Sequence, residues 1–424
     1  MKVTFDARTD VGLARQFNED SYLVDEDLGL YVIADGMGGS AGGEIASRMA
    51  CDEIHRYIGD HYEVVQQFSS GHAEATKENV SEMLVSAVHG ACAAIFTRAR
   101  DERELTGMGT TAVVLLIAGE QIFVAHVGDS RLFLLRQDQF HQLTRDHSLV
   151  EELKKLGKIS SKTEVKAKYR NAITRAVGIY ETVQVDTLEV SPIPGDRFLL
   201  TTDGMHGTAS TDDFLRLLRD VQSAEAADNL IRHANSRGGK DNITTILIDI
   251  LETEPQSAEL TQRKINTLKA VPLFKFLSFD ELLRVISLIE ERSFAANEIV
   301  FDEGEEGNAL FVLLQGKVKV SKKDVDIATL GEGDHFGELS LIDRSARSAT
   351  VTTLEPSLCL VMSRQRFYEI IREYSALSVK MLWCLARVCS VRLRETTDEL
   401  GLARSIMAQV QLPGVDDVED MFND

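Results

Sequence analysis

Carboxylates that end apolar segments beside glycine recur along the first part of the sequence. The stretch "LYVIADGMGG" runs into Asp35 and Gly36, and "RFLLTTDGM" runs in the same way into Asp203 and Gly204. A carboxylate at the end of a core strand is costly to bury alone, and glycine lets other backbone approach closely beside it. Carboxylate oxygens are the ligands that Mg²⁺ and Mn²⁺ prefer. The pattern therefore indicates metal-assisted chemistry.

Further acids stand at the edges of other apolar segments. "GGKDNITTILIDI" places Asp241 before a strand, "ARQFNEDSYLV" places Glu19 and Asp20 before another, and "FVAHVGDSRLF" puts Asp129 in the turn of a predicted hairpin. Each acid taken singly is also explained as the cap of a turn or helix, and spacing alone does not bring them together. A dinucleotide-binding loop at 36–41 is a weaker interpretation, because no ribose-binding acid follows on a second strand. A Walker loop is excluded, because no Gly-Lys-Ser/Thr follows.

Composition narrows the class of protein. The 424 residues are 44% hydrophobic and 27% charged, which is typical of a soluble protein with two or three domains. With 46 basic and 67 acidic residues, the net charge of −21 disfavours nucleic acid and anionic lipid as partners. The start "MKVTFDARTD" has no apolar signal region, and the longest apolar run is too short to span a bilayer. Five cysteines without a Cys-x-x-Cys pair indicate reduced thiols, so we expect a cytoplasmic protein.

The elements that must position these residues fall into two groups. Strand-like runs dominate the first part, with two or three helical stretches of which 80–101 is the clearest, and this favours an α+β sandwich. Many short strands punctuated by glycine occupy 294–363, between a helical lead-in and two closing helices, which is typical of a β jelly roll. The expected boundaries are a first domain at 1–252, a polar linker at 253–264, a second domain at 265–400 and an acidic tail at 401–424.

A run of ordered motifs carries a resemblance to a known family. "GLARQFNED", "ADGMGGSAGGEIAS", "GMGTTAVV", "VAHVGDSRLFLLR", "LTRDHS", "NAITRAVG", "LLTTDGM" and "GGKDNITTI" follow one another within residues 3–250. In this respect the segment resembles the metal-dependent type 2C protein serine/threonine phosphatases, and Asp-Gly-Met-Gly-Gly resembles their bacterial type. The resemblance implies two packed β-sheets flanked by helices. It also implies hydrolysis of phosphoserine and phosphothreonine in protein substrates by a metal-activated water.

The same resemblance implies a role for each acid. Asp35 would bridge two Mn²⁺ or Mg²⁺ ions, Asp20 would bind metal directly or through water with Glu19 behind it, and Asp129 would bind a weaker third ion. Arg15 would hold the phosphate, since its guanidinium fork matches two phosphate oxygens. The implied metal ligands are Asp20, Asp35, Gly36, Asp129, Asp203 and Asp241.

Two positions depart from the family pattern, and one segment varies within it. Met37 replaces a histidine thought to protonate the leaving group in many eukaryotic members, so water must supply that proton. Gly207 replaces an acid that many members carry four residues after Asp203. The segment 149–170 corresponds to a variable flap near the metal channel. Its lysines form either a solvated face or a steering patch for acidic phosphoproteins, and they are Lys154, Lys155, Lys158, Lys162, Lys166 and Lys168.

The second domain carries another recognisable segment. In "GDHFGELSLIDRSARSATV", at 333–351, Glu338 and Arg347 lie nine residues apart among backbone N–H groups that suit one phosphate. Residues 270–400 resemble cyclic-nucleotide-binding domains of the catabolite-activator and kinase-regulatory type. The resemblance places Glu338 on the ribose and Arg347 on the cyclic phosphate, and it does not distinguish cAMP from cGMP. The implied ligand residues are Gly337, Glu338, Leu339, Arg347, Ser348 and Ala349.

The last long helix leaves alternatives open. Leu377, Met381, Cys384, Val388 and Val391 step by four and three residues, a seam that would pair two protomers, and Trp383 is expected in the core rather than over a nucleotide base. The favoured function is a phosphatase regulated by cAMP or cGMP. The alternative is a phosphatase or pseudophosphatase whose second domain serves only dimerisation or partner binding. A transcription regulator is disfavoured, because the acidic residues after 400 leave no room for a helix-turn-helix.

Overall fold

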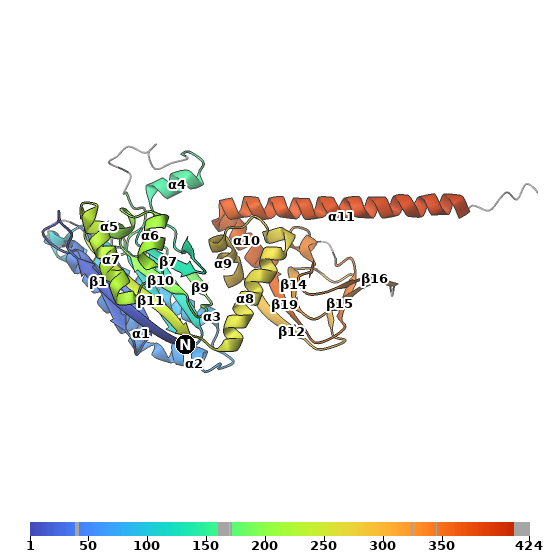
Figure 1. Cartoon of the computed structure of the whole chain (residues 1–424), viewed down its shortest axis with the longest axis horizontal. Coiled ribbons are helices and arrows are strands. Elements are labelled where there is room, and N and C mark those ends of the chain that lie inside the picture. Colours follow the sequence, from blue (N-terminus) through green and yellow to red (C-terminus); the bar gives the residue numbers. More distant parts are fainter. Residues whose placement is uncertain (39–41, 160–168, 170–171, 324, 345, 411–424) are drawn as a thin grey trace, which may run out of the picture. The chain divides into compact units, whose positions relative to one another are not determined.

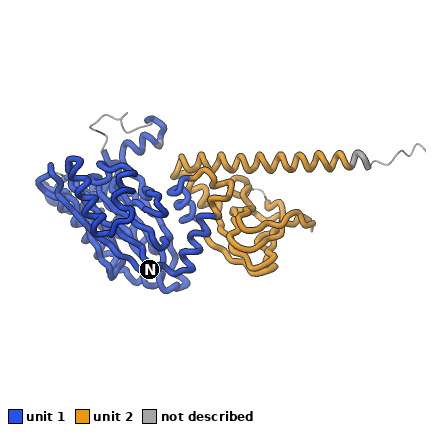
Figure 2. Tube along the Cα trace, viewed as in Figure 1, with its two compact units in different colours: residues 1–266, 278–289 blue, residues 267–277, 290–424 orange. Residues whose placement is uncertain are grey.

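The computed structural model describes the whole chain except residues 39–41, 160–168, 170–171, 324, 345 and 411–424 (Figure 1). It divides into two compact units, coloured separately in Figure 2. Unit 1 comprises residues 1–266 and 278–289, and unit 2 comprises residues 267–277 and 290–424. Each unit is described by itself.

Unit 1 is built on two antiparallel sheets that pack face to face. The core between them contains Ile33 and Val113 from one sheet and Phe198 and Ile246 from the other. The first sheet has the order β1 (Lys2–Asp10), β11 (Ile243–Glu252), β10 (Arg197–Thr201), β7 (Arg131–Arg136) and β8 (Gln139–Gln142). The second has the order β2 (Asp20–Asp25), β3 (Leu30–Met37), β5 (Ala112–Ala118), β6 (Gln121–Val127) and β9 (Asp186–Val190), with β4 (Gly109–Thr110) paired to β3.

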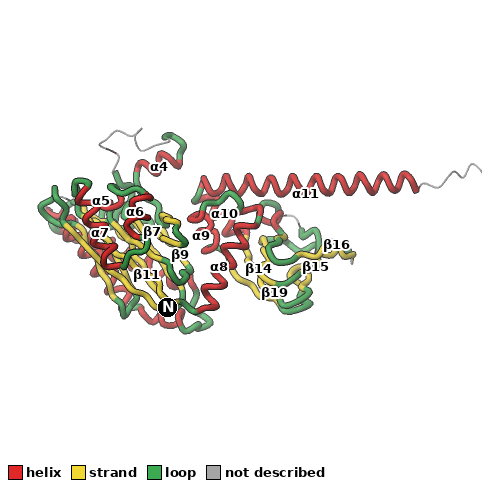
Figure 3. Tube along the Cα trace, in the orientation of Figure 1, coloured by secondary structure: helices red, strands yellow, loops and turns green. Residues whose placement is uncertain are grey.

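Helices cover the outer face of each sheet of unit 1 (Figure 3). The second sheet is covered by α1 (Gly42–Asp60), α2 (Tyr62–Ser69) and α3 (Lys77–Asp101), and the first by α5 (Asp203–His206), α6 (Thr211–Leu218) and α7 (Ser223–Ser236). Helix α3, followed by η1 (Arg103–Leu105), is the one described helix long and apolar enough to cross a membrane, with a mean hydropathy of 1.4. Its apolar side chains, among them Leu84 and Val88, are buried in the core of unit 1, as in the central helix of a globular domain.

One predicted hairpin is wrong in a way that matters for the site. The strands around Gly-Asp-Ser, β6 and β7, pair with other strands and belong to different sheets. Residues 128–130 therefore carry the chain from one sheet to the other. Gly128 has a φ of 105°, and a Cβ there would lie 2.5 Å from Thr111, so the crossing requires glycine. The consequence is that Asp129 lies where the two sheets meet.

Unit 2 is a jelly roll of two four-stranded sheets followed by helices. Phe311 and Phe336 stack at 5.2 Å in its core. One sheet has the order β12 (Glu290–Phe294), β19 (Ser357–Ser363), β14 (Ala309–Gln315) and β17 (His335–Phe336), and the other β13 (Ile299–Phe301), β18 (Thr350–Thr353), β15 (Val318–Lys322) and β16 (Val325–Leu330). The helices are η4 (Pro272–Phe274), η5 (Glu338–Leu341), α10 (Arg364–Glu373) and α11 (Ser375–Val410). The expected α+β class, with a sandwich and a jelly roll, is confirmed.

The compact units differ from the expected boundaries. The stretch predicted as a linker at 253–264 lies almost wholly in helix α8 (Pro255–Ala270), where proline suits the first helical position. Thr261, Ile265 and Leu268 are spaced by four and three residues and are buried. Helix α9 (Phe279–Ser287) lies within the range predicted for the second domain but packs in unit 1. The expected tail also begins too early, because α11 continues to Val410.

Candidate functional site

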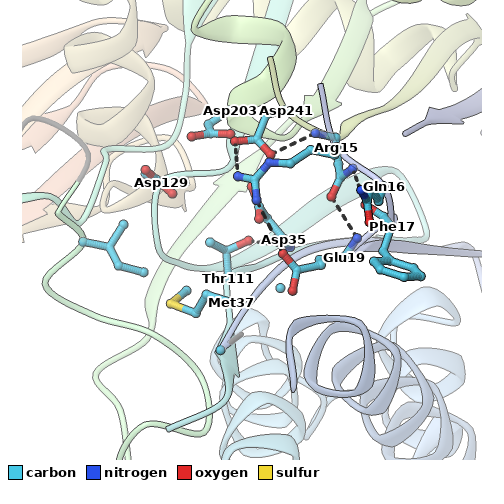
Figure 4. A pocket seen from close by; sticks show the side chains of 14 residues that line it. Arg15, Gln16, Phe17, Glu19, Asp35, Met37, Thr111, Asp129, Asp203 and Asp241 are labelled. Carbon is cyan, nitrogen blue, oxygen red and sulfur yellow. Dashed lines mark hydrogen bonds and ion pairs between the residues drawn. The ribbon is translucent and has the colours of Figure 1, made fainter. Parts of the chain in front are cut away.

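The acids predicted to bind metal converge at one end of the sandwich of unit 1. Strand β3 carries Asp35, the end of β10 leads into Asp203, Asp241 precedes β11, and the crossing turn carries Asp129. Together they line a cavity of about 630 Å³ (Figure 4). The cavity is lined by Arg15, Gln16, Phe17, Glu19, Asp35, Gly36, Met37, Gly38, Thr111, Asp129, Ile173, Asp203, Asp241 and Asn242. Asp20 is not among the lining residues and is buried, at 8% exposure, opposite Asp35 on the neighbouring strand.

Asp20 and Asp35 face each other directly across the β2–β3 pair. Like charges in that position repel, so this register is unfavourable unless something compensates it. Burial raises the pKa of Asp35 well above its usual value, and the charge of Asp20 raises it further. Burial also raises the pKa of Asp20 to about 7, although Thr202 donates a hydrogen bond of 2.8 Å to its Oδ2. The pair favours a nearby positive charge.

The same shortage of positive charge extends to the crossing turn. Burial, reinforced by the charge of Asp203, raises the pKa of Asp129 to about 7. Within the described residues, no three His, Cys, Asp or Glu side chains stand close enough together to hold an ion as they are placed. Oxygen-rich, desolvated acids of this kind are the donor set for Mg²⁺ or Mn²⁺. The residues present therefore fit divalent cations chemically.

Thr111 ties the central acid to the rest of the site. The backbone N–H of Asp35 donates to Thr111 Oγ1, and the N–H of Thr111 donates to the carbonyl of Asp35, both at 2.9 Å. Thr111 Oγ1 also lies 2.7 Å from Ser130 Oγ, next to Asp129. One threonine thus fixes the position of Asp35 relative to the crossing turn. Sequence analysis missed this residue, because a threonine in a β-branched run is not distinctive.

The glycines after the two strand-end acids are explained by close backbone approach. A Cβ on Gly36 would lie 2.0 Å from the carbonyl oxygen of Gly43, and one on Gly204 would lie 1.9 Å from that of Asn242. Neither position accepts a side chain, since the neighbouring atoms are backbone. The Asp-Gly pairs therefore allow neighbouring chain segments to pack directly against the acids.

Arg15 enters the cluster from the β1–β2 loop. Its Nη2 lies 2.9 Å from Asp241 Oδ2, and its Nη1 lies 3.8 Å from Glu19 Oε2. In Figure 4 the guanidinium lies among the acids, with the dashed contacts on either side. Its side chain is 46% exposed, so it remains accessible to a ligand that enters the cavity.

Asn242 holds this loop in place, and sequence analysis missed it. Its Nδ2 donates to the carbonyls of Val11 and Phe17 at 2.9 Å each, and its Oδ1 accepts from the N–H of Glu19 at 2.8 Å. The clamp fixes the backbone on both sides of Arg15. Phe17, fixed by the same contact, is 63% exposed and lies on the opposite side of Asp35 from Asp129 in Figure 4.

The positions that depart from the family pattern fall at different distances from the cavity. Met37 lines it, whereas Gly207 does not and donates its N–H to the carbonyl of Asp203 at 2.8 Å.

The segment predicted as a flap begins with α4 (Leu149–Lys155), where Lys154 pairs with Glu151 at 2.6 Å. Lys158 is exposed. Lys162, Lys166 and Lys168 lie outside the described residues, as does the side chain of Lys155.

The predicted nucleotide residues surround the short helix η5 of unit 2. Glu338 and Arg347 are buried, at 1% and 8% exposure. Arg347 donates to Ser340 Oγ at 2.8 Å and to the carbonyl of Ala309 at 3.2 Å, and its guanidinium stacks 3.9 Å from the ring centre of Phe301. Gly337 has a φ of 78°, and a Cβ there would meet the guanidinium of Arg347. Leu339 and Ser348 are exposed, and Ala349 is half-buried.

Glu338 is already engaged by a residue that sequence analysis did not single out. Arg392 of α11, 54 residues further along, donates from Nη1 to Glu338 Oε1. In the described part of the chain, Glu338 Oε2 and Arg347 Nε are buried without a hydrogen-bond partner. Buried polar atoms in this state are rare and are satisfied by a bound group or water. Two of them on the predicted ligand residues fit a polar ligand such as a cyclic nucleotide.

The long helix α11 differs from the expectation. Leu377, Met381, Cys384 and Val388 are buried inside unit 2, where η4 and α10 pack against the helix. The predicted dimer seam is therefore mostly used within the unit, and only Val391 of the five is exposed. Trp383 is 63% exposed, so its expected core position is wrong. It lies on the side of the helix turned away from the packed residues.

Comparison with known proteins supports the family resemblance of each unit. A family profile described as "Protein phosphatase 2C" matches residues 14–247, more than half of the chain, and one described as "Cyclic nucleotide-binding domain" matches residues 291–374. The serine/threonine phosphatase stp of Listeria innocua is 37% identical over 246 residues, which is 57% of this chain and 94% of that protein. The protein phosphatase PhpP of Streptococcus pneumoniae is 33% identical over 257 residues, 58% of this chain and 98% of that protein.

Solved structures agree with this likeness. The Mycobacterium tuberculosis serine/threonine phosphatase PstP/Ppp matches with a TM-score of 0.52 and 32% identity, over 59% of this chain and 99% of that one. A PstP catalytic domain solved with two manganese ions matches with a TM-score of 0.51 and 31% identity, over the same shares. The chain therefore belongs to the protein phosphatase 2C family, as a serine/threonine phosphoprotein phosphatase joined to a cyclic nucleotide-binding domain.

Proposed function

We propose that the acid cluster of unit 1 holds two divalent cations, Mn²⁺ or Mg²⁺, and a third at Asp129. Asp35, Asp203, Asp241 and the Gly36 carbonyl would bind the pair, and Asp20 would bind metal directly or through water. Bound divalent cations supply a Lewis acid that lowers the pKa of water and offsets charge on a phosphate. The observation that carries this proposal is the direct pairing of Asp20 with Asp35, both with raised pKa values.

The residues of the chain would orient the phosphorylated side chain. Arg15, clamped by its loop, holds two phosphate oxygens so that the phosphorus faces the acids. Thr111 and Asn242 keep Asp35 and the Arg15 loop fixed, so little reorganisation is needed at the moment of reaction. Water attacks phosphorus, the bond to the serine or threonine oxygen breaks, and that oxygen takes up a proton. Met37 has none to donate, so a second water supplies it.

We further propose that unit 2 binds cAMP or cGMP and that binding activates the phosphatase. Glu338 and Arg347 are the groups that recognise the ribose and the cyclic phosphate. The supporting observation is their burial together with the two unpartnered polar atoms, Glu338 Oε2 and Arg347 Nε. A nucleotide changes the rate only through a different affinity for two arrangements of the protein. The five free cysteines are consistent with a reducing, cytoplasmic location, which belongs to the same proposal.

The test is a titration of the full chain with cAMP and cGMP, following heat by calorimetry and phosphate release in Mn²⁺. Wild type should bind one of them and accelerate by about 5- to 150-fold. Arg347→Ala should bind neither and keep its basal rate, whereas Arg372→Ala, an exposed arginine on α10, should behave as wild type. The absence of binding to wild type at millimolar nucleotide would refute regulation by cyclic nucleotide.

A second function for unit 2 rests on the outer face of α11. Val379, Ala386, Leu393 and Leu400 repeat every seven residues and are exposed. Such a repeat suits a coiled coil with a second copy of the chain. Sedimentation of wild type against Leu393→Glu tests this: a dimer that dissociates in the variant supports dimerisation, and a monomeric wild type excludes it.

A further inference from the structure

Helix α9 belongs to unit 1 although the chain on both sides of it belongs to unit 2. Residues 267–277 lead into it and residues from 290 lead away from it, and both are part of unit 2. The nine residues of α9 are therefore a piece of the phosphatase unit that is tethered at both ends to the nucleotide-binding unit. The Ser278 capping box starts the helix and so fixes where it begins.

One face of α9 is buried in the phosphatase core. Phe279, Leu283 and Ile286 lie four and three residues apart and pack into the hydrophobic cluster between the two sheets, where Leu283 is 4% exposed. The ring of Phe279 lies 4.3 Å from that of His141. The helix packs against β8 and β9, the last strands of the two sheets at the same edge of the sandwich. Burial of these apolar side chains stabilises the docked position of the helix.

A hydrogen bond connects α9 to the chain that follows β8. Arg284 Nη2 donates to the carbonyl of Leu143 at 2.6 Å. Leu143 is the first residue after β8, and its own N–H donates to the carbonyl of Leu132 on β7 at 2.8 Å. The position of Arg284 therefore affects the position of the segment 143–148 through this hydrogen bond.

That segment is hydrogen-bonded to the start of β7 and to the turn that carries Asp129. Thr144 Oγ1 accepts from the N–H of Leu132 at 2.9 Å, and Asp146 pairs with Arg131 through two contacts of 2.8 and 2.7 Å. The N–H of His147 donates to the carbonyl of Gly128 at 2.8 Å. Gly128 and Arg131 stand on either side of Asp129. A continuous set of contacts thus runs from α9 through residues 143–147 to an acid of the active site.

We propose that α9 is the element through which unit 2 controls the phosphatase, with Arg284 as the residue that positions the Asp129 turn. This inference rests on the proposed regulation by cyclic nucleotide and names its route. Because both ends of α9 continue into unit 2, a change in the path of the chain there pulls on the docked helix. A packed helix takes up discrete positions rather than deforming continuously. The segment 143–148 also ends at Ser148, which caps α4. A shift of α9 would therefore move both the Asp129 turn and the start of the flap.

The experiment uses the full chain in Mn²⁺ with p-nitrophenyl phosphate, so that protein docking plays no part. The readout is the ratio of rates with and without saturating cAMP or cGMP, beside nucleotide affinity from calorimetry. Arg284→Gln should bind nucleotide as wild type does, while its ratio falls from about 5- to 150-fold to within about 2-fold. Arg284→Lys keeps a donor for the Leu143 carbonyl and should restore most of the ratio, which a merely structural residue would not show. Arg292→Gln, an exposed arginine on β12, is the matched control and should keep the full ratio.

A second variant and a second readout keep the outcome decisive. Leu283→Ala loosens the docked face and should also lose the ratio, and circular dichroism checks that it folds. Arg284→Gln should weaken the Mn²⁺ site that contains Asp129, seen by calorimetry as a several-fold rise in one dissociation constant without nucleotide. If Arg284→Gln keeps the wild-type ratio of rates with and without nucleotide and binds Mn²⁺ normally, the proposed role of α9 is wrong, and regulation by cyclic nucleotide is not affected. A wild type that neither binds nor responds to nucleotide would instead overturn the regulation proposed above.

Discussion

The acid cluster of unit 1 and the buried polar pair of unit 2 differ in how the protein satisfies its own charges. In unit 1, Asp20 and Asp35 face each other and have raised pKa values, with Arg15 as the nearby cation. In unit 2, Arg347 is engaged by the carbonyl of Ala309 and by Ser340, and Glu338 is engaged by Arg392.

The difference predicts opposite responses to a ligand. A cation added to unit 1 relieves repulsion that the fold cannot relieve by itself, so it should stabilise the unit as well as activate it. A nucleotide added to unit 2 must take over contacts that the protein already makes, so its affinity is the difference between two sets of contacts. In unit 1 an added cation should gain affinity from the repulsion between the acids. In unit 2 the affinity for a nucleotide should be reduced by the contacts that Glu338 and Arg347 already make within the protein.

The largest effect should come from removing the central charge of unit 1. Asp35→Asn should lower Mn²⁺-dependent hydrolysis of p-nitrophenyl phosphate by at least about 1,000-fold, the upper range for loss of one electrostatic contact in a site. The same change should raise the melting temperature of the metal-free protein, because it removes repulsion with Asp20. Asp27→Asn, at an exposed position in the turn between β2 and β3, is the control. Unchanged turnover at saturating Mn²⁺, with normal circular dichroism, would contradict the proposed metal site.

Lowering the pH should reduce the free energy of unfolding of unit 1 because of a buried histidine. Burial and the neighbouring His147 lower the pKa of His126 to about 3, with Asp186 and Asp146 acting in the opposite direction. Unfolded His126 titrates near 6.5, so the unfolded state binds more protons between these values. Its contribution is therefore fully present above about 6.5 and is lost as pH falls toward 3, by up to about 1.4 kcal/mol per pH unit.

The measurement compares urea unfolding of wild type and His126→Phe from pH 7 to 5. Wild type should lose stability faster as the pH falls, because the variant has no proton to take up there. Equal metal concentrations in both samples cancel the contribution of the acid cluster. Parallel curves for the two proteins would show that His126 is not held neutral by its surroundings.

Competition in unit 2 should be visible in nucleotide affinity. Arg392→Ala frees Glu338 for the ribose and should tighten nucleotide binding by about 5-fold, the upper range for a partly exposed ion pair. Arg394→Ala on the same helix, where the arginine bonds to Ser390, is the matched control. Calorimetry gives both dissociation constants. Weaker binding in Arg392→Ala would mean that Arg392 assists the ligand instead of competing with it.

The smallest effect concerns protein substrates at the rim of unit 1. Phe17 is held outward beside Arg15 by the Asn242 clamp, and a phosphopeptide in the cavity would cover part of its ring. Phe17→Ala should raise KM for a phosphopeptide by about 3-fold, in line with partial burial of an aromatic side chain, and leave KM for p-nitrophenyl phosphate unchanged. Leu251→Ala, at the far end of β11, serves as control. An equal change in KM for both substrates would show that Phe17 supports the structure of the site and does not contact the peptide.

The sequence was informative wherever a residue's role depended on its immediate neighbours. Asp35 and Asp203 stand out because each follows a strand-like run and precedes glycine, and Asp241 because it precedes a strand two residues after Gly239. The structure brings all three to one cavity. Arg15 and the Glu338–Arg347 spacing were found through ordered motifs. The α+β class followed from strand-like and helical periodicity.

What sequence reasoning missed depends on contacts between distant residues. The β6–β7 turn has the length of a hairpin, and only the pairing of β7 with β10 shows that it crosses between sheets. Arg392 reaches Glu338 across 54 residues, which no local pattern reports. The polar stretch after 252 has the composition of a linker, and its buried residues are spaced too widely in the sequence to stand out, although they lie on one helical face.

The pairing of β1 with β11 sets the order in which the phosphatase can be completed during synthesis. Residues 2–10 leave the ribosome first, yet their partners are residues 243–252. Until these emerge, β1 offers an unpaired strand edge, the kind of surface that promotes wrong association. The core between the sheets also waits for Leu283 of α9. A nascent chain therefore completes the core of unit 1 only after residues 267–277 of unit 2 have been translated, so a chain that stops before α9 lacks part of the phosphatase core.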